Sequence, residues 1–266
     1  IALEEKIRDQ FAGPEAQVVG IGPAGEGKVP LACMVGDGGR AVGRGGIGAV
    51  MGSKNLKAIA VKGAKAVPIA EETGFNQVAG RIGQIIGGNR RMAMLFKWGT
   101  AFHMDTGWQK GAVPTQNWRV GLWKDGCINL GGKKMADTIL QPHESCLNCP
   151  VRCTRWVKIA GGKHKMEGAG PEYETLAALG SLCLNDNLES VCKADDLCKR
   201  AGLDTVSVGA VIAFAMEAQE RGFFTARDVD GLDLTWGNSD TIIELVEKIA
   251  TCEGIGELLS QGVRAT

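Results

Sequence analysis

Three closely spaced cysteines carry the clearest chemical signal in this 266-residue sequence. Cys146, Cys149 and Cys153 form a Cys-x2-Cys-x3-Cys run with Pro150 inside it. Three thiolates on one loop can hold three corners of an iron–sulfur cluster. A zinc ribbon would need a second Cys-x2-Cys pair or paired histidines, which the sequence lacks. We therefore predict an iron–sulfur cluster, whose fourth ligand is either Cys183 or a cysteine outside this chain.

A glycine-rich, basic loop is the second signal. Residues 38–54 include seven glycines, and residues 38–63 include five basic residues and no acidic one. Exposed N–H groups and arginine side chains suit phosphate oxygens, so we expect an anion-binding loop; a glycine turn with solvated bases is the alternative. The order Ser53-Lys54 is the reverse of a Walker A loop. We expect neither a strand leading into Gly43-x-Gly45-x-x-Gly48 nor a helix after it, which argues against a dinucleotide fingerprint.

Two carboxylates and a second tight loop complete the candidate chemistry. Glu172 and Glu174 flank Tyr173, the only tyrosine, at the predicted start of a helix. Acids at a helix start are ordinary, but a carboxyl group near a metal centre can also carry protons. The segment Gly202-Leu203-Asp204 precedes an almost wholly apolar helix, whose free N–H groups could meet a polar ligand. A capped core helix is the alternative for this segment.

The elements that must position these groups predict an α+β fold. Residues 1–63 contain a predicted helix at 3–11, apolar stretches at 17–21 and 29–35, and a strand at 57–62. Apolar spacing indicates a helix that ends at Gly87-Gly88, while residues 101–145 show mainly loop signals. The remainder is mostly helical, with helices expected at 172–182, 188–200, 205–221, 239–251 and 256–264. We expect one domain over 1–63 and a helical domain over 64–266.

Composition excludes several classes of protein. The 30 basic and 30 acidic residues balance, which argues against a general nucleic-acid binder or a polybasic membrane-surface protein. No stretch approaches 18 uncharged apolar residues, so we expect no membrane span. The nine cysteines are an odd number and no secretory leader is visible, which favours a reducing, cytoplasmic location. The first residue is Ile1, so we expect a piece of a longer protein.

Together the motifs resemble the aldehyde ferredoxin oxidoreductase family. The longest match runs from Gly39 through Arg40-Ala41 to Ile59, and a shorter one is Pro114-Thr115-Gln116-Asn117-Trp118. The cysteine run, the segment Gly170-Pro171-Glu172-Tyr173-Glu174-Thr175 and Gly202-Leu203-Asp204-Thr205 follow in the family's order. These matches relate nearly the whole chain to the middle of a longer enzyme.

The resemblance implies a set of cofactors and site residues. Family members hold tungsten, or sometimes molybdenum, between two pterins beside a four-iron cluster, with magnesium at the pterin phosphates. Glu174, or as second choice Glu172, is expected to be the catalytic carboxylate. Lys199 stands where the family's pterin motif has Asp, which puts one pterin contact in question. The expected cofactor-binding residues are Arg40, Ala41, Gly43, Gly202, Leu203 and Asp204, and the expected cluster ligands are Cys146, Cys149 and Cys153.

The resemblance also implies a function and partners. We expect oxidation of aldehydes to carboxylic acids, with electrons passed to ferredoxin or another electron-transfer subunit, in a homo- or hetero-oligomer. A relative that reduces a carboxylic acid or an aromatic acyl-CoA is the alternative enzyme, and a non-catalytic iron–sulfur module is the alternative of another class. In the family, one pterin-binding stretch precedes the region matching Ile1. A third domain after the region matching Thr266 supplies a second pterin motif, an active-site histidine and the fourth cluster cysteine.

Overall fold

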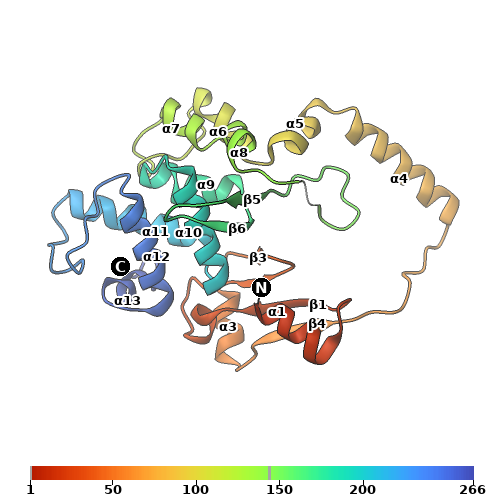
Figure 1. Cartoon of the computed structure of the whole chain (residues 1–266), viewed down its shortest axis with the longest axis horizontal. Helices are drawn as coiled ribbons and strands as arrows, with labels where there is room; N and C mark the ends of the chain where they lie inside the picture. The colour runs from red at the N-terminus through yellow and green to blue at the C-terminus, as the bar shows by residue number, and fades with distance from the viewer. Residues whose placement is uncertain (1, 143–144) are drawn as a thin grey trace.

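The computed structural model of the chain describes residues 2–142 and 145–266. Its helices and two small antiparallel sheets confirm the predicted α+β class. A sheet built from residues 17–61 lies at one end of the molecule, and helices from residues 90–138 lie at the opposite end (Figure 1). A two-stranded hairpin and the helices of residues 173–220 lie between them, so this middle layer contacts both ends.

The larger sheet is antiparallel throughout and has the order β3-β2-β1-β4. Its apolar and β-branched runs predicted β1 and β4, whereas the apolar stretch 29–35 overlaps only the start of β2. The helix expected at 3–11 is a short α-helix, α1 (Ala2–Ile7), continued by a π-helical turn, Arg8–Ala12. The strands are β1 (Gln17–Ile21), β2 (Met34–Gly36), β3 (Arg40–Val42) and β4 (Ala58–Val61).

The glycine-rich loop is more regular than its sequence indicates. Strand β3 leads into it and helix α3 (Ile47–Ser53) follows it, so the expectation of no strand before and no helix after was wrong. A Cβ atom on Gly52 would lie 1.8 Å from the backbone oxygen of Gly25 in α2 (Pro23–Glu26). Glycine lowers helix propensity, but here it is the residue that lets α3 and α2 pack so closely.

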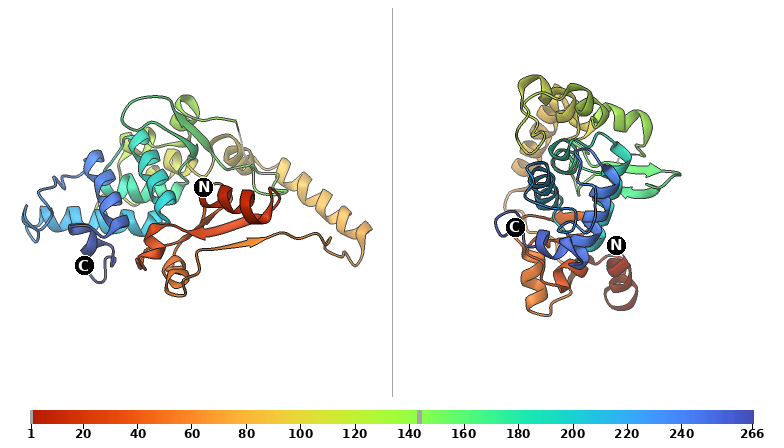
Figure 2. Two further views of the ribbon diagram at one scale, coloured as in Figure 1. Left: turned by 60° about the horizontal axis from the view of Figure 1, so that its bottom comes forward. Right: turned by 90° about the vertical axis from the view of Figure 1, so that its left-hand side faces the viewer.

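Helix α4 (Glu72–Gly87) stands away from the rest of the molecule (Figures 1 and 2). It confirms the helix predicted from apolar spacing, and it ends at the predicted glycines. No residue of α4 is buried. Across the part of the chain that the structure describes, no helix is long and apolar enough to cross a membrane.

Helices also occupy much of residues 90–138, where the sequence indicated irregular structure from residue 101 onward. Their cores contain buried Met104, Leu130 and Met135. The prediction missed them because they are short, so that too few turns are present to show apolar periodicity. They are α5 (Arg90–Trp98), α6 (Phe102–Gly107), a 3-10 turn (Trp108–Lys110), α7 (Lys124–Asn129) and α8 (Gly132–Thr138).

The hairpin of β5 (Trp156–Ile159) and β6 (Met166–Ala169) was not predicted. It follows the cysteine run and leads directly into α9 (Tyr173–Leu179), which begins after Pro171. Each hairpin strand has only four residues, too few for a clear alternating pattern. The hairpin nevertheless matters, because it connects the cysteine loop with the helix that carries Glu174.

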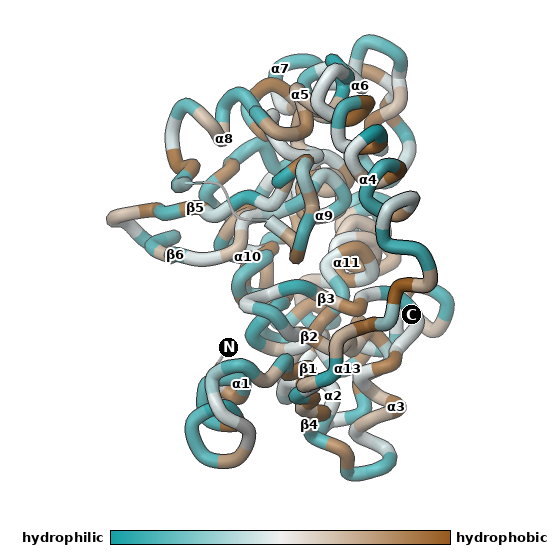
Figure 3. Tube along the Cα trace, turned by 90° about the vertical axis from the view of Figure 1, so that its right-hand side faces the viewer, coloured by the Kyte–Doolittle hydropathy of each residue, from teal (hydrophilic) through white to brown (hydrophobic). Residues whose placement is uncertain are grey.

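The helices predicted after residue 172 are confirmed, with changes at their ends. Helix α11 (Thr205–Glu220) is apolar nearly all round as expected, and it packs against α9 (Figure 3). A Cβ atom on its Gly209 would lie 2.4 Å from the backbone carbon of Ala178, so this glycine allows the two helices to approach closely. The others are α10 (Leu188–Ala201), α12 (Ser239–Thr251) and α13 (Ile255–Leu259), the last shorter than predicted.

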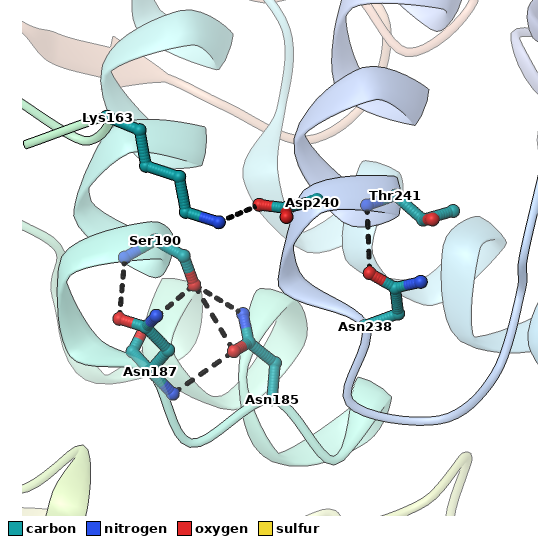
Figure 4. A network of polar contacts seen from close by, with 7 residues as sticks. All are labelled: Lys163, Asn185, Asn187, Ser190, Asn238, Asp240 and Thr241. Carbon is teal, nitrogen blue, oxygen red and sulfur yellow. Dashed lines mark hydrogen bonds and ion pairs between the residues drawn. The ribbon is translucent and has the colours of Figure 1, made fainter.

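Asparagine caps fix the starts of α10 and α12 (Figure 4). The Asn187 side chain accepts a hydrogen bond from the Ser190 N–H at 3.2 Å, and Asn238 accepts one from the Thr241 N–H at 3.3 Å. Each cap of this kind stabilises a helix by about 1 kcal/mol. The Asn187 cap thus fixes the first turn of α10. The last turn, which ends at Gly202, reaches the candidate site.

Candidate functional site

A cavity of about 280 Å³ lies where the glycine-rich loop meets the middle layer. Five of the sequence-predicted residues line it: Arg40, Ala41, Glu172, Leu203 and Asp204. Its remaining lining includes residues of the hairpin, α9, α10 and the start of α11: Gly39, Thr154, Ala169, Gly170, Thr175, Asp195, Lys199 and Thr205. The structure thus gathers in one place groups that are up to 166 positions apart in sequence, from Gly39 to Thr205.

Backbone hydrogen bonds join the predicted cofactor-binding segment 202–204 to residues 31–33, which precede β2. The Cys33 N–H donates to the Gly202 carbonyl at 2.8 Å, and the Asp204 N–H donates to the Leu31 carbonyl at 3.0 Å. Gly202 has φ of 73°, a left-handed conformation that favours glycine and ends α10. The turn after α10 is therefore held against residues 31–33, which lead into β2.

Asp204 has the structural role of a cap as well as a place in the cavity. Its carboxylate accepts from the N–H groups of Val206 at 3.4 Å and Ser207 at 3.0 Å, which confirms the predicted start of α11. Arg44 of the glycine-rich loop lies 3.7 Å from the same carboxylate. A Cβ atom on Gly43 would stand 3.4 Å from it, so Gly43 also lies beside this motif. Asp204 is only 6% exposed, so its negative charge is held at the cavity wall by these partners.

Arg40 connects the cavity with the cysteine loop. Its Nη1 donates to the Cys146 sulfur at 3.1 Å and its Nη2 donates to the Thr154 hydroxyl at 3.1 Å, while Nε pairs with Asp37 at 2.9 Å. Gly39 beside it has φ of 124°, and a Cβ atom there would come within 3.3 Å of Ala169 Cβ across the cavity. The loop therefore holds the Arg40 guanidinium in place. Because Gly39 has no side chain, its backbone beside the cavity stays uncovered.

The three cysteines of the run lie together at the surface, with Cys146 exposed and the other two half-buried. Burial raises the pKa of Cys153, and the charges of Glu172, Cys146 and Cys149 raise it further. Within residues 2–142 and 145–266, no group of His, Cys, Asp or Glu converges on a single metal ion. A cubane cluster differs from a single ion because each thiolate binds its own iron, so the donor set fits a cluster.

Cys183 lies elsewhere. It is fully buried in a 3-10 turn (Ser181–Cys183), and its thiol donates to the carbonyls of Ala178 at 3.5 Å and Gly209 at 3.7 Å. Burial strongly raises the pKa of this thiol. These contacts make Cys183 a packed core residue, so the geometry favours the other alternative, a fourth ligand outside the chain.

The two carboxylates occupy different positions. Glu172 lines the first cavity and accepts a hydrogen bond from the Thr100 hydroxyl, which itself accepts from the Tyr173 N–H at 2.9 Å. Glu174 is exposed and lines a second cavity of about 370 Å³. Glu172 lines this second cavity too, so it stands where the two cavities meet.

Lys199, which stands where the family's pterin motif has Asp, pairs with a buried carboxylate. Its ammonium group lies 2.6 Å from the Asp195 carboxylate one helical turn earlier and donates to the Ala169 carbonyl at 2.9 Å. Asp195 is 1% exposed, and burial raises its pKa while Lys199 lowers it. An i,i+4 pair is visible in a sequence, but its burial at a cavity is not. Thr100, which contacts Glu172, was not predicted, because no motif or spacing in the sequence marks it.

Comparison with known proteins identifies the relatives of this arrangement. Residues 77–266 match the family described as aldehyde ferredoxin oxidoreductase, domains 2 & 3, and residues 1–63 match its N-terminal domain. The tungsten-containing aldehyde ferredoxin oxidoreductase of Pyrococcus furiosus is 39% identical over 267 residues, covering 97% of this chain and 42% of that protein. The WOR-like subunit of an aliphatic sulfonate oxidoreductase from the same organism is 30% identical over 264 residues, covering 98% and 41%.

A solved structure shares the fold. A chain of the active site complex BamBC of benzoyl coenzyme A reductase, in complex with 1,5 dienoyl-CoA, superposes with a TM-score of 0.80. It is 26% identical and matches 98% of this chain and 40% of its own length. The α+β architecture is therefore that of a chain in a known redox enzyme.

The chain belongs to the aldehyde ferredoxin oxidoreductase family, as the motif resemblance predicted. It spans about two-fifths of the length of the curated relatives that it matches.

Proposed function

We propose that the full-length protein is a tungsten–pterin, iron–sulfur oxidoreductase that oxidises aldehydes to carboxylic acids and passes the electrons to ferredoxin. The observation that carries this proposal is the position of Arg40. One guanidinium reaches both the cofactor cavity and the first cysteine of the run, so it would lie between a pterin and a cluster. The names of the tungsten-containing relatives support the same conclusion.

The cavity suits a pterin, because its lining alternates donors and acceptors. Arg40, Lys199 and the hydroxyl groups of Thr154 and Thr205 can donate, while carboxylate and carbonyl oxygens can accept. We assign the phosphate end of the pterin to the basic glycine-rich loop, with Arg40 donating to phosphate oxygens. The Ala41 carbonyl is the ligand we propose for a magnesium ion at those phosphates. Molybdenum remains the alternative to tungsten.

The cysteine loop would hold the cluster. Cys146, Cys149 and Cys153 are three proposed ligands, and the fourth is proposed to come from outside the chain, because Cys183 is packed in the core. We also propose that residues 1–63 complete a pterin-binding domain and that residues 64–266 form the helical domain that carries the cluster ligands. Electrons would leave toward ferredoxin or another electron-transfer subunit of an oligomer, in a cytoplasmic setting.

The reaction requires water, a proton acceptor and an electron acceptor. An aldehyde and one water become a carboxylate as two electrons and three protons leave. When bound, the tungsten–pterin group would accept the electron pair, and the cluster would pass electrons on singly. We propose that Glu174, or Glu172 as second choice, takes a proton during this change. Glu172 has the better position for a group near the cofactor, because it lines both cavities.

A second enzyme function has one specific observation in its favour. The fold likeness to a benzoyl coenzyme A reductase chain makes reduction of an aromatic acyl-CoA the alternative reaction. Reduction of a carboxylic acid is the reverse of the proposed reaction and uses the same groups. A non-catalytic iron–sulfur module is the alternative in which the cavity holds no pterin.

Metal analysis and turnover of the full-length protein, purified without oxygen, separate these functions. Tungsten or molybdenum near one per chain, with aldehyde-dependent reduction of ferredoxin, is the expected result. Iron and sulfide without either metal would leave only the electron-transfer module. Turnover of an aromatic acyl-CoA without aldehyde oxidation would replace the proposed reaction by its alternative.

A matched pair of variants tests the role of Arg40. Arg40→Met removes the donors while keeping an unbranched apolar stem, and we expect loss of pterin together with a changed cluster spectrum. Arg44→Met, four residues later in the same loop, removes a charge that contacts Asp204 and not the cysteines. An Arg40→Met protein with full metal content and an unchanged cluster spectrum would remove Arg40 from both roles.

A further inference from the structure

Arg155 is a charged residue buried beside the cysteine run. It lies two positions after Cys153, immediately before β5, and it is only 2% exposed. Removing a charged group from water is costly unless other partners replace the solvent, so a buried guanidinium needs acceptors for its N–H donors. The acceptors of Arg155 come from two separate parts of the chain, which this residue therefore joins.

One set of acceptors lies at the end of α5. Nη1 donates to the carbonyl of Lys97 at 3.2 Å, and Nη2 donates to the carbonyl of Phe96 at 3.0 Å. Carbonyl groups in the last turn of a helix have no partner inside the helix, and the helix dipole favours a cation there. The chain leaves α5 at Gly99, where φ is 65° and an added Cβ atom would stand 3.0 Å from Cδ of Arg155. Glycine at this position leaves room for the arginine side chain.

The other set of acceptors lies on the cysteine loop itself. Nε donates to the carbonyl of Cys153 at 3.0 Å, and Nη2 also donates to the carbonyl of Arg152 at 3.0 Å. The backbone of Arg155 extends the connection, because its carbonyl accepts from the N–H of Gly170, two residues before Glu172, at 2.9 Å. One buried residue thus connects the last cysteine of the run with α5 and with the segment that carries Glu172.

The charge of Arg155 acts on the same groups. Burial lowers the pKa of its guanidinium, and the negative charges of Glu172 and of a Cys153 thiolate oppose this effect. Arginine stays protonated in proteins, so the positive charge is a permanent feature of the loop. Carbonyl oxygens satisfy the N–H groups without cancelling that charge, which therefore acts on the thiolate of Cys153.

We propose that Arg155 is a positioning residue for the iron–sulfur cluster, which fixes the cysteine loop against α5 and keeps a positive charge beside the ligand Cys153. This inference rests on the proposed function, because it takes the three cysteines of the run as cluster ligands. A reduced cluster carries one more negative charge than an oxidised one, so a fixed cation nearby stabilises the reduced form more strongly. Arg155 would therefore raise the midpoint potential of the cluster.

Two substitutions of Arg155 separate its charge from its hydrogen bonds, and a third removes the same charge from another position. Arg155→Gln removes the charge and most of the donors, whereas Arg155→Lys keeps the charge and loses the planar fork. Lys158→Gln is the matched control, because it removes one exposed positive charge from β5, where Lys158 pairs with Glu167 at 2.7 Å. Each full-length variant and the wild-type protein are purified without oxygen. Iron and sulfide content, the EPR spectrum of the reduced cluster and an EPR-monitored redox titration are then compared.

The expected results differ among the three variants. Arg155→Gln should shift the equilibrium toward the oxidised cluster at least about tenfold, which lowers a one-electron midpoint potential by about 59 mV. Arg155→Lys should keep most of the potential but hold less iron and give a changed EPR spectrum, because a single ammonium group cannot serve both sets of carbonyls. Lys158→Gln should match the wild-type protein, since solvent screens an exposed charge.

An Arg155→Gln protein with the iron content, EPR spectrum and potential of the wild type would overturn the inference. If Arg155→Gln yields no folded protein, Arg155→Lys decides, and an unchanged iron content and spectrum in that variant would overturn it equally. A shift of the same size in Lys158→Gln would show that net charge, and not the position of Arg155, sets the potential. Wild-type protein without iron and sulfide would refute the proposed function, whereas a wild-type cluster that neither Arg155 variant alters would refute this inference alone.

Discussion

The contact between Gly22 and the end of α10 allows a sharp test of how the cofactor cavity is built. Gly22 precedes α2, and a Cβ atom placed on it would lie 2.2 Å from the Ala201 carbonyl oxygen and 2.3 Å from its carbon. The next atom, the Gly202 nitrogen, is 2.7 Å away. All three atoms belong to the backbone, so no side-chain rotation can relieve the overlap. Gly22→Ala must therefore push the segment between β1 and α2 away from the Gly202–Leu203–Asp204 turn.

The expected cost follows from the kind of contact. Overpacking of a well-filled interior costs about 1–3 kcal/mol, and an overlap with fixed backbone belongs at the upper end of that range. At roughly 2–4 °C per kcal/mol, a cost of about 3 kcal/mol should lower the first thermal transition by about 6–12 °C. Hydrogen bonds of Cys33 and Asp204 across the same junction should weaken, so we also expect a lower pterin content in the purified protein.

Thermal denaturation and pterin analysis of full-length Gly22→Ala would measure both effects. Gly80→Ala is the matched control, because its Cβ atom meets nothing within 4 Å on the exposed face of α4. Alanine there should be neutral or stabilise the helix by up to about 1 kcal/mol. If Gly22→Ala has the same melting temperature and pterin content as the wild-type protein, the close contact of Gly22 with Ala201 and Gly202 is not what holds these two parts of the chain together.

Three further predictions concern buried groups. Lys199→Met leaves the Asp195 carboxylate buried without its partner and should cost about 3–5 kcal/mol in unfolding free energy, whereas the double variant with Asp195→Leu should recover much of it. Burial lowers the pKa of His164 in the folded state. Folding is therefore favoured at a pH above the pKa that His164 has in the unfolded chain, and this stabilisation is lost as the pH falls below it. His164→Phe should flatten the decline in melting temperature between about pH 7 and pH 5. In cluster-free protein, a thiol reagent should modify exposed Cys146 well before buried Cys33, because burial raises the pKa of Cys33 to about 12; mass spectrometry of the labelled peptides would show the order.

The sequence predicted those parts of the fold whose information is local and repeated. Long helices such as α10 and α11 have enough turns for an apolar pattern to show, and each begins after a residue type that is typical of helix caps, Asn187 and Asp204. Short elements were missed for the opposite reason. The four-residue strands of the hairpin and the glycine-bearing helix α3 are fixed by packing partners far away in the sequence, which no local pattern records.

The sequence indicated candidate site residues, but not how these residues lie relative to one another. Resemblance to a family identified Arg40, the cysteine run and the Asp204 motif, but no spacing indicates that Arg40 touches Cys146 across 106 positions. Thr100 could not be recognised at all, because it is an isolated residue that reaches Glu172 and Tyr173 only in the folded chain. The order of Glu172 and Glu174 likewise needed the two cavities, which only the folded chain defines.

The contact between Arg40 and Cys146 also has a consequence for the order in which the molecule assembles. It closes a loop of more than a hundred residues, and closing a loop of that length early in folding costs entropy that few contacts yet offset. We expect the sheet and the helical layer to form first and the junction between them last. A cofactor that touches both sides would then contribute its binding free energy to that final step, so insertion of the cofactor and completion of the fold become one event.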